Sequence, residues 1–122
     1  MSDEKFGARK IIMEHRIHCQ EPWFSLLKSG QKPVEGRKNS LHYQKIKVGD
    51  CIEFFEGARS FKVRVTGINK YSSVKEYLSM ESLARALPGV ATVAEGLAIY
   101  HVWNSPEDVA KWGFLGIQVK VE

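Results

Sequence analysis

One short segment combines charged side chains at a spacing that suits the binding of an anion. The stretch GQKPVEGR, residues 30–37, places two cations and one carboxylate within six positions. Arginine supplies a rigid planar fork for a phosphate or a base edge, and lysine supplies a point charge. In an extended chain Glu35 and Arg37 share one face and Lys32 lies on the other. One cleft would therefore hold all three only if the strand bulges near Gly36, and a surface ion pair is the plain alternative.

A second group of polar residues lies where a predicted strand meets a predicted helix. Ser73 fits the N-cap of that helix, and Ser72 is free to contact an anion at the positive helix end. Tyr71 either stacks on a base or packs in the core. Glu95 is the third residue after Thr92 in a T-x-x-E capping box, which gives it a structural role beside a catalytic one.

Sequence periodicity divides the chain into the elements that must position these groups. Strands are predicted at 10–19, 32–37, 51–55, 61–68 and 116–122. Helices are predicted at 22–30, from 73 to about 80, at 83–87, from 92 to about 103, and after an N-cap at 105. Strict alternation indicates strands buried on one face, and the helical block lies between two of them. We predict an α+β fold, a small, mostly antiparallel β-barrel with helices packed at one side.

The apolar residues predict how the first helix packs. Trp23, Leu26 and Leu27 follow a helical spacing and form its expected apolar face. The tryptophans, Trp103 among them, are expected in the core rather than as stacking platforms.

The composition is that of one domain with a modest excess of basic residues. The 122 residues are 43% hydrophobic and carry a formal net charge of +4, which suits one core and an anionic partner. We expect a frayed segment at 1–9 and a single domain at 10–122. No stretch is long and apolar enough for a membrane, and residues 1–10 do not form a signal peptide, so we expect a cytoplasmic protein. The cysteines and histidines lack metal-ligand spacing, and we expect neither a metal nor a cofactor.

The stretch EPWFSLLKSGQKPVEGR resembles the signature of the ASCH family, the activating-signal-cointegrator homology domains of the PUA-like superfamily. Members carry an apolar helix followed by G-x-K-x-x-E-x-R, here Gly30, Lys32, Glu35 and Arg37. The resemblance continues through VGDCIEFF, YSSVKEYL, LPGV, Glu95-Gly96 and WGFLGIQVKVE, about residues 11–122. It implies a PUA-like β-barrel with a cleft between barrel and helices, and RNA or a nucleotide-like ligand as the partner.

The function that we expect first is a nucleic-acid or nucleotide-binding module that uses this cationic cleft. The residues expected to contact the ligand are Lys32, Arg37, Lys38, Tyr71, Ser72 and Ser73. Such binding weakens steeply with salt, because phosphate contacts release counterions. A protein-interaction module in transcription or translation is a further alternative.

A small metal-independent hydrolase is the alternative from another class. One ASCH branch, the N(4)-acetylcytidine amidohydrolases, uses a lysine, a threonine and a glutamate. The resemblance places Lys32 and Glu95 at the lysine and the glutamate, but Glu35 stands at the threonine position. A carboxylate cannot replace a hydroxyl nucleophile by the same route, so Glu35 would serve only as a general base with a raised pKa. Ribonuclease activity, known for some ASCH members, is the other hydrolase alternative.

Overall fold

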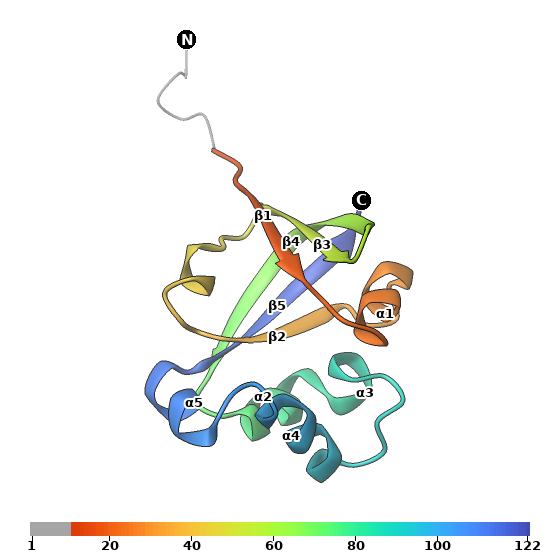
Figure 1. The fold of residues 1–122 in the computed structure, drawn as a ribbon. Helices are drawn as coiled ribbons and strands as arrows, with labels where there is room; N and C mark the ends of the chain where they lie inside the picture. Colours follow the sequence, from red (N-terminus) through yellow and green to blue (C-terminus); the bar gives the residue numbers. More distant parts are fainter. Residues whose placement is uncertain (1–10) are drawn as a thin grey trace.

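Five β-strands form one sheet that curls into a half barrel, and helices α2 to α5 gather at one side of it (Figure 1). The structure, a computed structural model, describes residues 11–122. The segment 1–9 that we predicted to be frayed lies outside the described residues. The elements in chain order are β1 (Glu14–His18), α1 (Trp23–Ser29), β2 (Val34–Lys38), the 3-10 helix η1 (Tyr43–Lys45), β3 (Cys51–Glu56), β4 (Arg59–Tyr71), α2 (Val74–Glu81), α3 (Leu83–Ala86), α4 (Val93–His101), α5 (Pro106–Trp112) and β5 (Phe114–Val121).

The strand order β1-β3-β4-β5-β2 places β1 and β2 at the two edges of the sheet. The pairs β3–β4, β4–β5 and β2–β5 are antiparallel, as predicted for most of the sheet. Strand β1 instead runs parallel to β3, from Glu14 opposite Cys51 to His18 opposite Phe55. Among the described residues β1 and β2 do not pair with each other, so the barrel is open along this seam.

Side chains at the N-caps explain where three of the helices begin. The hydroxyl of Ser73 accepts a hydrogen bond from the backbone N–H of Glu76, and Ser105 caps α5 in the same way. Thr92 and Glu95 form the complete capping box that the sequence predicts. At Ser73 the box is only half formed, because the Glu76 carboxylate accepts from Ser72 instead.

Two apolar clusters fill the molecule, one within the curl of the sheet beneath α1 and one between the sheet and α2 to α5. The first contains Ile17, Cys19, Phe24, Leu27, Ile46, Ile52, Phe54, Val63, Val65, Leu115, Ile117 and Val119. The second contains Val34, Val74, Tyr77, Leu78, Ala86, Leu87, Tyr100, Val109 and Phe114. Trp23 packs against both clusters, so the N-terminal end of α1 lies where the two layers meet.

One prediction about apolar packing, the inner face of α1, was confirmed only in part, and one, the burial of Trp103, was wrong. The buried residues of α1 are Phe24 and Leu27, whereas Trp23 and Leu26 are half-buried. Phe24 enters the sheet cluster and meets Phe61 edge to face, with ring centroids 5.0 Å apart. Trp103 lies beyond the end of α4 and is 74% exposed, so it is no part of the core.

Candidate functional site

A cavity of about 610 Å³ lies between the half barrel and α4. Its lining comes from the end of β1, the start of α1, strand β2 and the C-terminal end of α4. The lining residues are His18, Cys19, Gln20, Glu21, Pro22, Trp23, Lys32, Glu35, Gly36, Arg37, Lys38, Tyr43, Leu87, Ile99, Tyr100, Val102, Trp103 and Asn104. Its volume is in the range of small-molecule sites, about 300–1,000 Å³. The segment that the sequence singles out thus lies in a cleft between barrel and helices.

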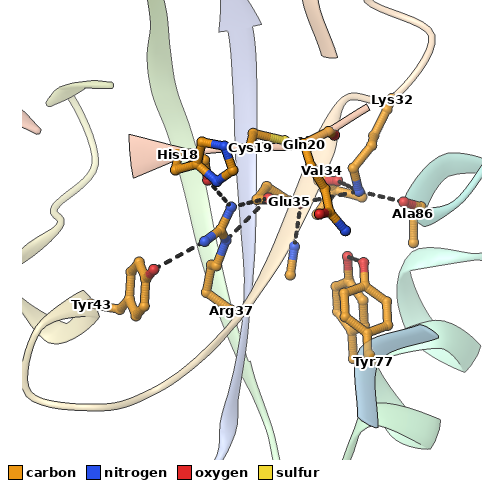
Figure 2. Close-up of polar contacts among 12 residues, drawn as sticks. His18, Cys19, Gln20, Lys32, Val34, Glu35, Arg37, Tyr43, Tyr77 and Ala86 are labelled. Atoms are coloured by element: carbon orange, nitrogen blue, oxygen red, sulfur yellow. Dashed lines mark hydrogen bonds and ion pairs between the residues drawn. The ribbon is translucent and has the colours of Figure 1, made fainter. Parts of the chain in front are cut away.

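Lys32 forms part of the cavity floor although only 1% of it is exposed. Its Nζ donates to the carbonyl oxygens of Val34, at 2.8 Å, and of Ala86, and it lies 3.2 Å from Oε1 of Glu35 (Figure 2). Three acceptors match the three ammonium protons. Burial alone lowers the pKa of Lys32, but the neighbouring Tyr100 and Glu35 outweigh it and raise the pKa overall. Lys32 is therefore a fixed positive charge.

Glu35 lies between the two cations of the segment. Its Oε1 accepts from the backbone N–H of Gly36 at 3.2 Å and faces Lys32. Its Oε2 accepts from Nε and Nη2 of Arg37, at 3.1 and 2.7 Å. Burial raises the pKa of Glu35, but Arg37 and Lys32 lower it by more, so that the carboxylate stays ionised.

Arg37 closes the open seam of the half barrel. Its Nη2 donates to the backbone carbonyl of His18 at the end of β1, 3.1 Å away, while its Nη1 donates to the hydroxyl of Tyr43 at 3.0 Å. The guanidinium thus joins the two edge strands, β1 and β2, that do not pair directly (Figure 2). Burial lowers the pKa of Arg37, and the Glu35 carboxylate raises it by more.

Lys32, Glu35 and Arg37, here named the charged triad, meet without the bulge that the sequence analysis required. The β2–β5 register is regular from Val34 to Lys38, and Lys32 precedes the strand, so its side chain reaches around to Glu35. Gly36 faces the opposite side of β2. A Cβ at that position would lie 2.7 Å from Phe114 and 2.8 Å from Tyr77, so the absence of a side chain lets β2 pack closely there.

Aromatic side chains from separate elements wall the cavity above the triad. The ring centroid of Trp23 lies 5.8 Å from Nζ of Lys32, and the ring of Tyr43 lies 5.6 Å from Cζ of Arg37. Tyr100 contributes from α4, and its hydroxyl lies 3.1 Å from that of Tyr77 in the core behind it. A charged floor with aromatic walls suits a flat polar ligand such as a nucleobase.

Two polar side chains at the cavity are less tightly held than the triad. Lys38 lies at the end of β2, with 23% of its side chain exposed, and its Nζ is 3.2 Å from Oδ2 of the exposed Asp108. Gln20 lines the cavity, and its side-chain amide is not hydrogen-bonded to the other residues drawn in Figure 2. An exposed ion pair exchanges easily with a ligand phosphate.

The other residues proposed from the sequence do not line the cavity. Tyr71 donates its hydroxyl proton to Oε2 of Glu81, 2.5 Å away, and burial with this carboxylate raises the pKa of Tyr71 to about 12. Ser72 is not free, since its N–H and hydroxyl both donate to Glu76. Ser73 caps α2. Glu95 accepts from backbone N–H groups in its capping box.

Glu81, at the end of α2, is a buried carboxylate that sequence reasoning missed. It is 4% exposed and accepts from Asn69, Tyr71 and Gln118 at 3.0, 2.5 and 2.7 Å. Burial raises the pKa of Glu81, but these hydrogen bonds and Arg85 lower it below its usual value. The sequence did not predict that Glu81 is buried, because it lies among polar residues at a helix end. Its hydrogen-bond donors come from β4 and β5, which only the folded chain brings to it.

The geometry favours binding at this site over acid–base chemistry. A general base needs a raised pKa and a free oxygen, and Glu35 has a lowered pKa and donors on both oxygens. Cys19 also lines the cavity, and burial raises the pKa of its thiol to about 12, so it is not a reactive thiolate.

Two searches of the described residues bear on other kinds of site. Between residues 11 and 122, no cluster of three His, Cys, Asp or Glu side chains is arranged to hold a metal ion. None of the helices in this range has the length and apolar character needed to cross a membrane.

A curled half barrel with helices at one side and a cleft between them is the PUA-like architecture. The sequence profile of the ASCH domain matches residues 17–120. The chain therefore belongs to the ASCH domain family.

Solved structures of similar proteins agree with this assignment. The crystal structure of the hypothetical protein PH0355 is 36% identical, with a TM-score of 0.84, and the match covers 90% of this chain and 100% of that one. The solution NMR structure of protein PF0455 from Pyrococcus furiosus is also 36% identical, with a TM-score of 0.76, and the match covers 89% of this chain and 97% of that one. The curated proteins include no significant match to the chain.

Proposed function

We propose that the cavity binds one nucleotide unit of a single-stranded nucleic acid, RNA above all, and leaves it uncleaved. The observation that carries the proposal is the combination of a charged floor and aromatic walls in a cavity of about 610 Å³. The charged triad has a formal net charge of +1, since two cations flank one carboxylate. Membership of the ASCH family, which is generally regarded as RNA-binding, supports the same conclusion.

The proposed roles follow from how firmly each residue is held. Lys32 and Arg37 supply a fixed positive field, because their protons are largely used within the protein. Lys38 is free to exchange Asp108 for a ligand phosphate, and it is the proposed phosphate contact. The amide of Gln20 carries a donor and an acceptor that suit a base edge.

Titration of labelled single-stranded RNA by fluorescence anisotropy, at about 50 and about 200 mM salt, tests the proposal. We expect salt-sensitive binding that Lys38→Gln weakens, with the slope of log K against log salt reduced by about one. Asp108→Asn removes the carboxylate that competes for Lys38 and should tighten binding a few-fold. Gel electrophoresis of the same samples should show intact RNA.

The matched control is Lys120→Gln. Lys120 is exposed and lies near the C-terminal end of β5, opposite Arg64 of β4. Lys38 pairs with Phe114 at the other end of β5. Its removal changes the net charge by the same amount and should leave RNA binding nearly unchanged. Equal losses in both variants would reduce the binding to a general charge effect and contradict the cavity proposal. Cleaved RNA would replace binding with a ribonuclease function.

A further inference from the structure

Trp103 is a large apolar side chain that the fold leaves in solvent at the rim of the cavity. It is 74% exposed, and the preceding Val102 is 69% exposed. Both residues line the cavity, just beyond the end of α4. An exposed tryptophan beside a binding cavity points to an interaction surface, because burying an aromatic ring is otherwise favourable.

The backbone that carries Trp103 is firmly held although its side chain is not. The N–H groups of Trp103 and Asn104 donate to the carbonyl of Tyr100, at 3.3 and 3.2 Å. The carbonyl of Asn104 lies 2.6 Å from Nδ1 of His101, and the amide of Asn104 also donates to Tyr100. Four hydrogen bonds therefore hold this turn, and the turn keeps the indole of Trp103 at the rim of the cavity.

The other two tryptophans do not share this position. Trp23 is half-buried, packs against both apolar clusters and forms part of the cavity wall near Lys32. Trp112 is half-buried at the end of α5, with Nζ of Lys111 5.4 Å from its ring. Trp103 is the tryptophan whose face is available to a ligand that extends out of the cavity.

We propose that Trp103 is a stacking platform for the base of a second nucleotide, next to the one held in the cavity. This inference rests on the proposed function, since it requires a nucleotide in the cavity. Every base has a flat apolar face, so such stacking tolerates any sequence. The continuity of Trp103 with the cavity and the positive charge at Lys38 favour a nucleic-acid strand over an apolar protein partner.

The test compares ligands with and without the second base. Calorimetry would measure binding of 5′-AMP, the dinucleotide pApA, and two pApA analogues in which one or the other base is replaced by an abasic ribose. The abasic analogues keep the phosphates, so charge is matched. We expect pApA to bind about tenfold more tightly than the tighter-binding of its two abasic analogues, which keeps the base in the cavity, and to quench tryptophan fluorescence more than that analogue does.

Trp103→Ala should remove that tenfold difference and the additional quenching, and it should weaken pApA much more than it weakens 5′-AMP. Trp103→Phe should keep most of the difference, because a smaller ring still stacks. Trp112→Phe is the matched control and should change neither quantity. The side chain of Trp103 is exposed, so its removal should not impair folding.

Distinct results overturn the inference and the proposed function. If 5′-AMP binds and Trp103→Ala keeps the advantage of pApA, the platform is wrong and the cavity proposal stands. If Trp103→Ala weakens 5′-AMP and pApA equally, Trp103 is a wall of the cavity and not a second subsite. If the wild type binds neither ligand nor RNA, both proposals fail. Self-association of the wild type that Trp103→Ala abolishes would show that the surface binds protein instead.

Discussion

Two buried glutamates on opposite sides of the sheet differ in the partners that stabilise their charge. Glu35, 6% exposed, has the full charges of Lys32 and Arg37 as partners and lies under a cavity. Glu81, 4% exposed, is held mainly by the neutral donors of Tyr71 and its neighbours, and it does not line the cavity described above. Each carboxylate is satisfied, so burial alone does not mark a functional site.

The difference lies in what remains after each carboxylate is neutralised. The charged triad retains a formal net charge of +1 and lines the cavity, so its field favours an anion there. The hydrogen bonds of Glu81 leave no excess of positive charge, apart from the exposed Arg85 at 3.5 Å, and they tie α2 to β4 and β5. We interpret the charged triad as a source of positive potential for a ligand, and the hydrogen bonds of Glu81 as a structural link between α2 and the sheet.

The largest effect should come from Glu35→Gln, which breaks the charge balance of the triad. Two cations would then lie close together without a carboxylate, and we expect a loss of about 3–5 kcal/mol in the free energy of unfolding. Lys32→Met should cost less, about 1–3 kcal/mol, because Glu35 keeps its pair with Arg37, and the two carbonyl oxygens and one Glu35 oxygen lose only the ammonium as a partner. Urea denaturation of the three proteins measures both values. A greater loss in Lys32→Met than in Glu35→Gln would contradict the order of partners described for the triad.

A smaller effect is expected for Glu81→Gln. The amide oxygen still accepts from Tyr71, but the amide nitrogen takes the place of the oxygen that accepts from Gln118, so that hydrogen bond is lost and the others become neutral, and we expect a loss of about 1–2 kcal/mol. The RNA affinity should be unchanged, because Glu81 does not line the cavity. Urea denaturation and anisotropy on one preparation give both quantities. A loss of RNA binding at full stability would extend the functional site to this side of the sheet.

The smallest expected effect is the stability difference between the wild type and Glu81→Gln at acidic pH. The folded-state pKa of Glu81 lies below its usual value of 4.5, so its ionisation stabilises the fold fully above about pH 4.5, and this stabilisation is lost as pH falls through the folded-state pKa. Wild type and Glu81→Gln should therefore differ most near neutral pH and converge in acid. Thermal unfolding at stepwise lower pH measures the gap. A gap that widens in acid would mean that the folded-state pKa of Glu81 is raised and not lowered.

Local patterns predicted the elements well because their signals are local. The capping hydroxyls of Ser73, Thr92 and Ser105 mark three helix starts, and the structure confirms each. The family signature predicted the ASCH assignment and the cleft. The parallel pairing of β1 with β3 had no such signal, because it depends on which strands meet in space.

The details of the site depended on contacts between distant residues. The carbonyl oxygen of Ala86, far along the chain, accepts a hydrogen bond from Nζ of Lys32 and helps to hold it in its buried position. Nothing near Lys32 in the sequence distinguishes it from an exposed lysine that binds a ligand directly. For Trp103 the error was the opposite, since it was expected to be buried and is exposed. Tryptophan usually packs in a core, and the exposure of Trp103 follows from its place beyond the end of α4.

The tight fit of Gly36 has a consequence for how ligand preference can change in such a fold. The floor has little freedom, since β2 packs closely against Phe114 on one face and carries Glu35 and Arg37 of the charged triad on the other. The rim residues Gln20 and Trp103 are exposed and carry few such constraints. Substitutions that alter selectivity at low cost in stability therefore belong to the rim, and the G-x-K-x-x-E-x-R signature identifies the scaffold more than it identifies the ligand.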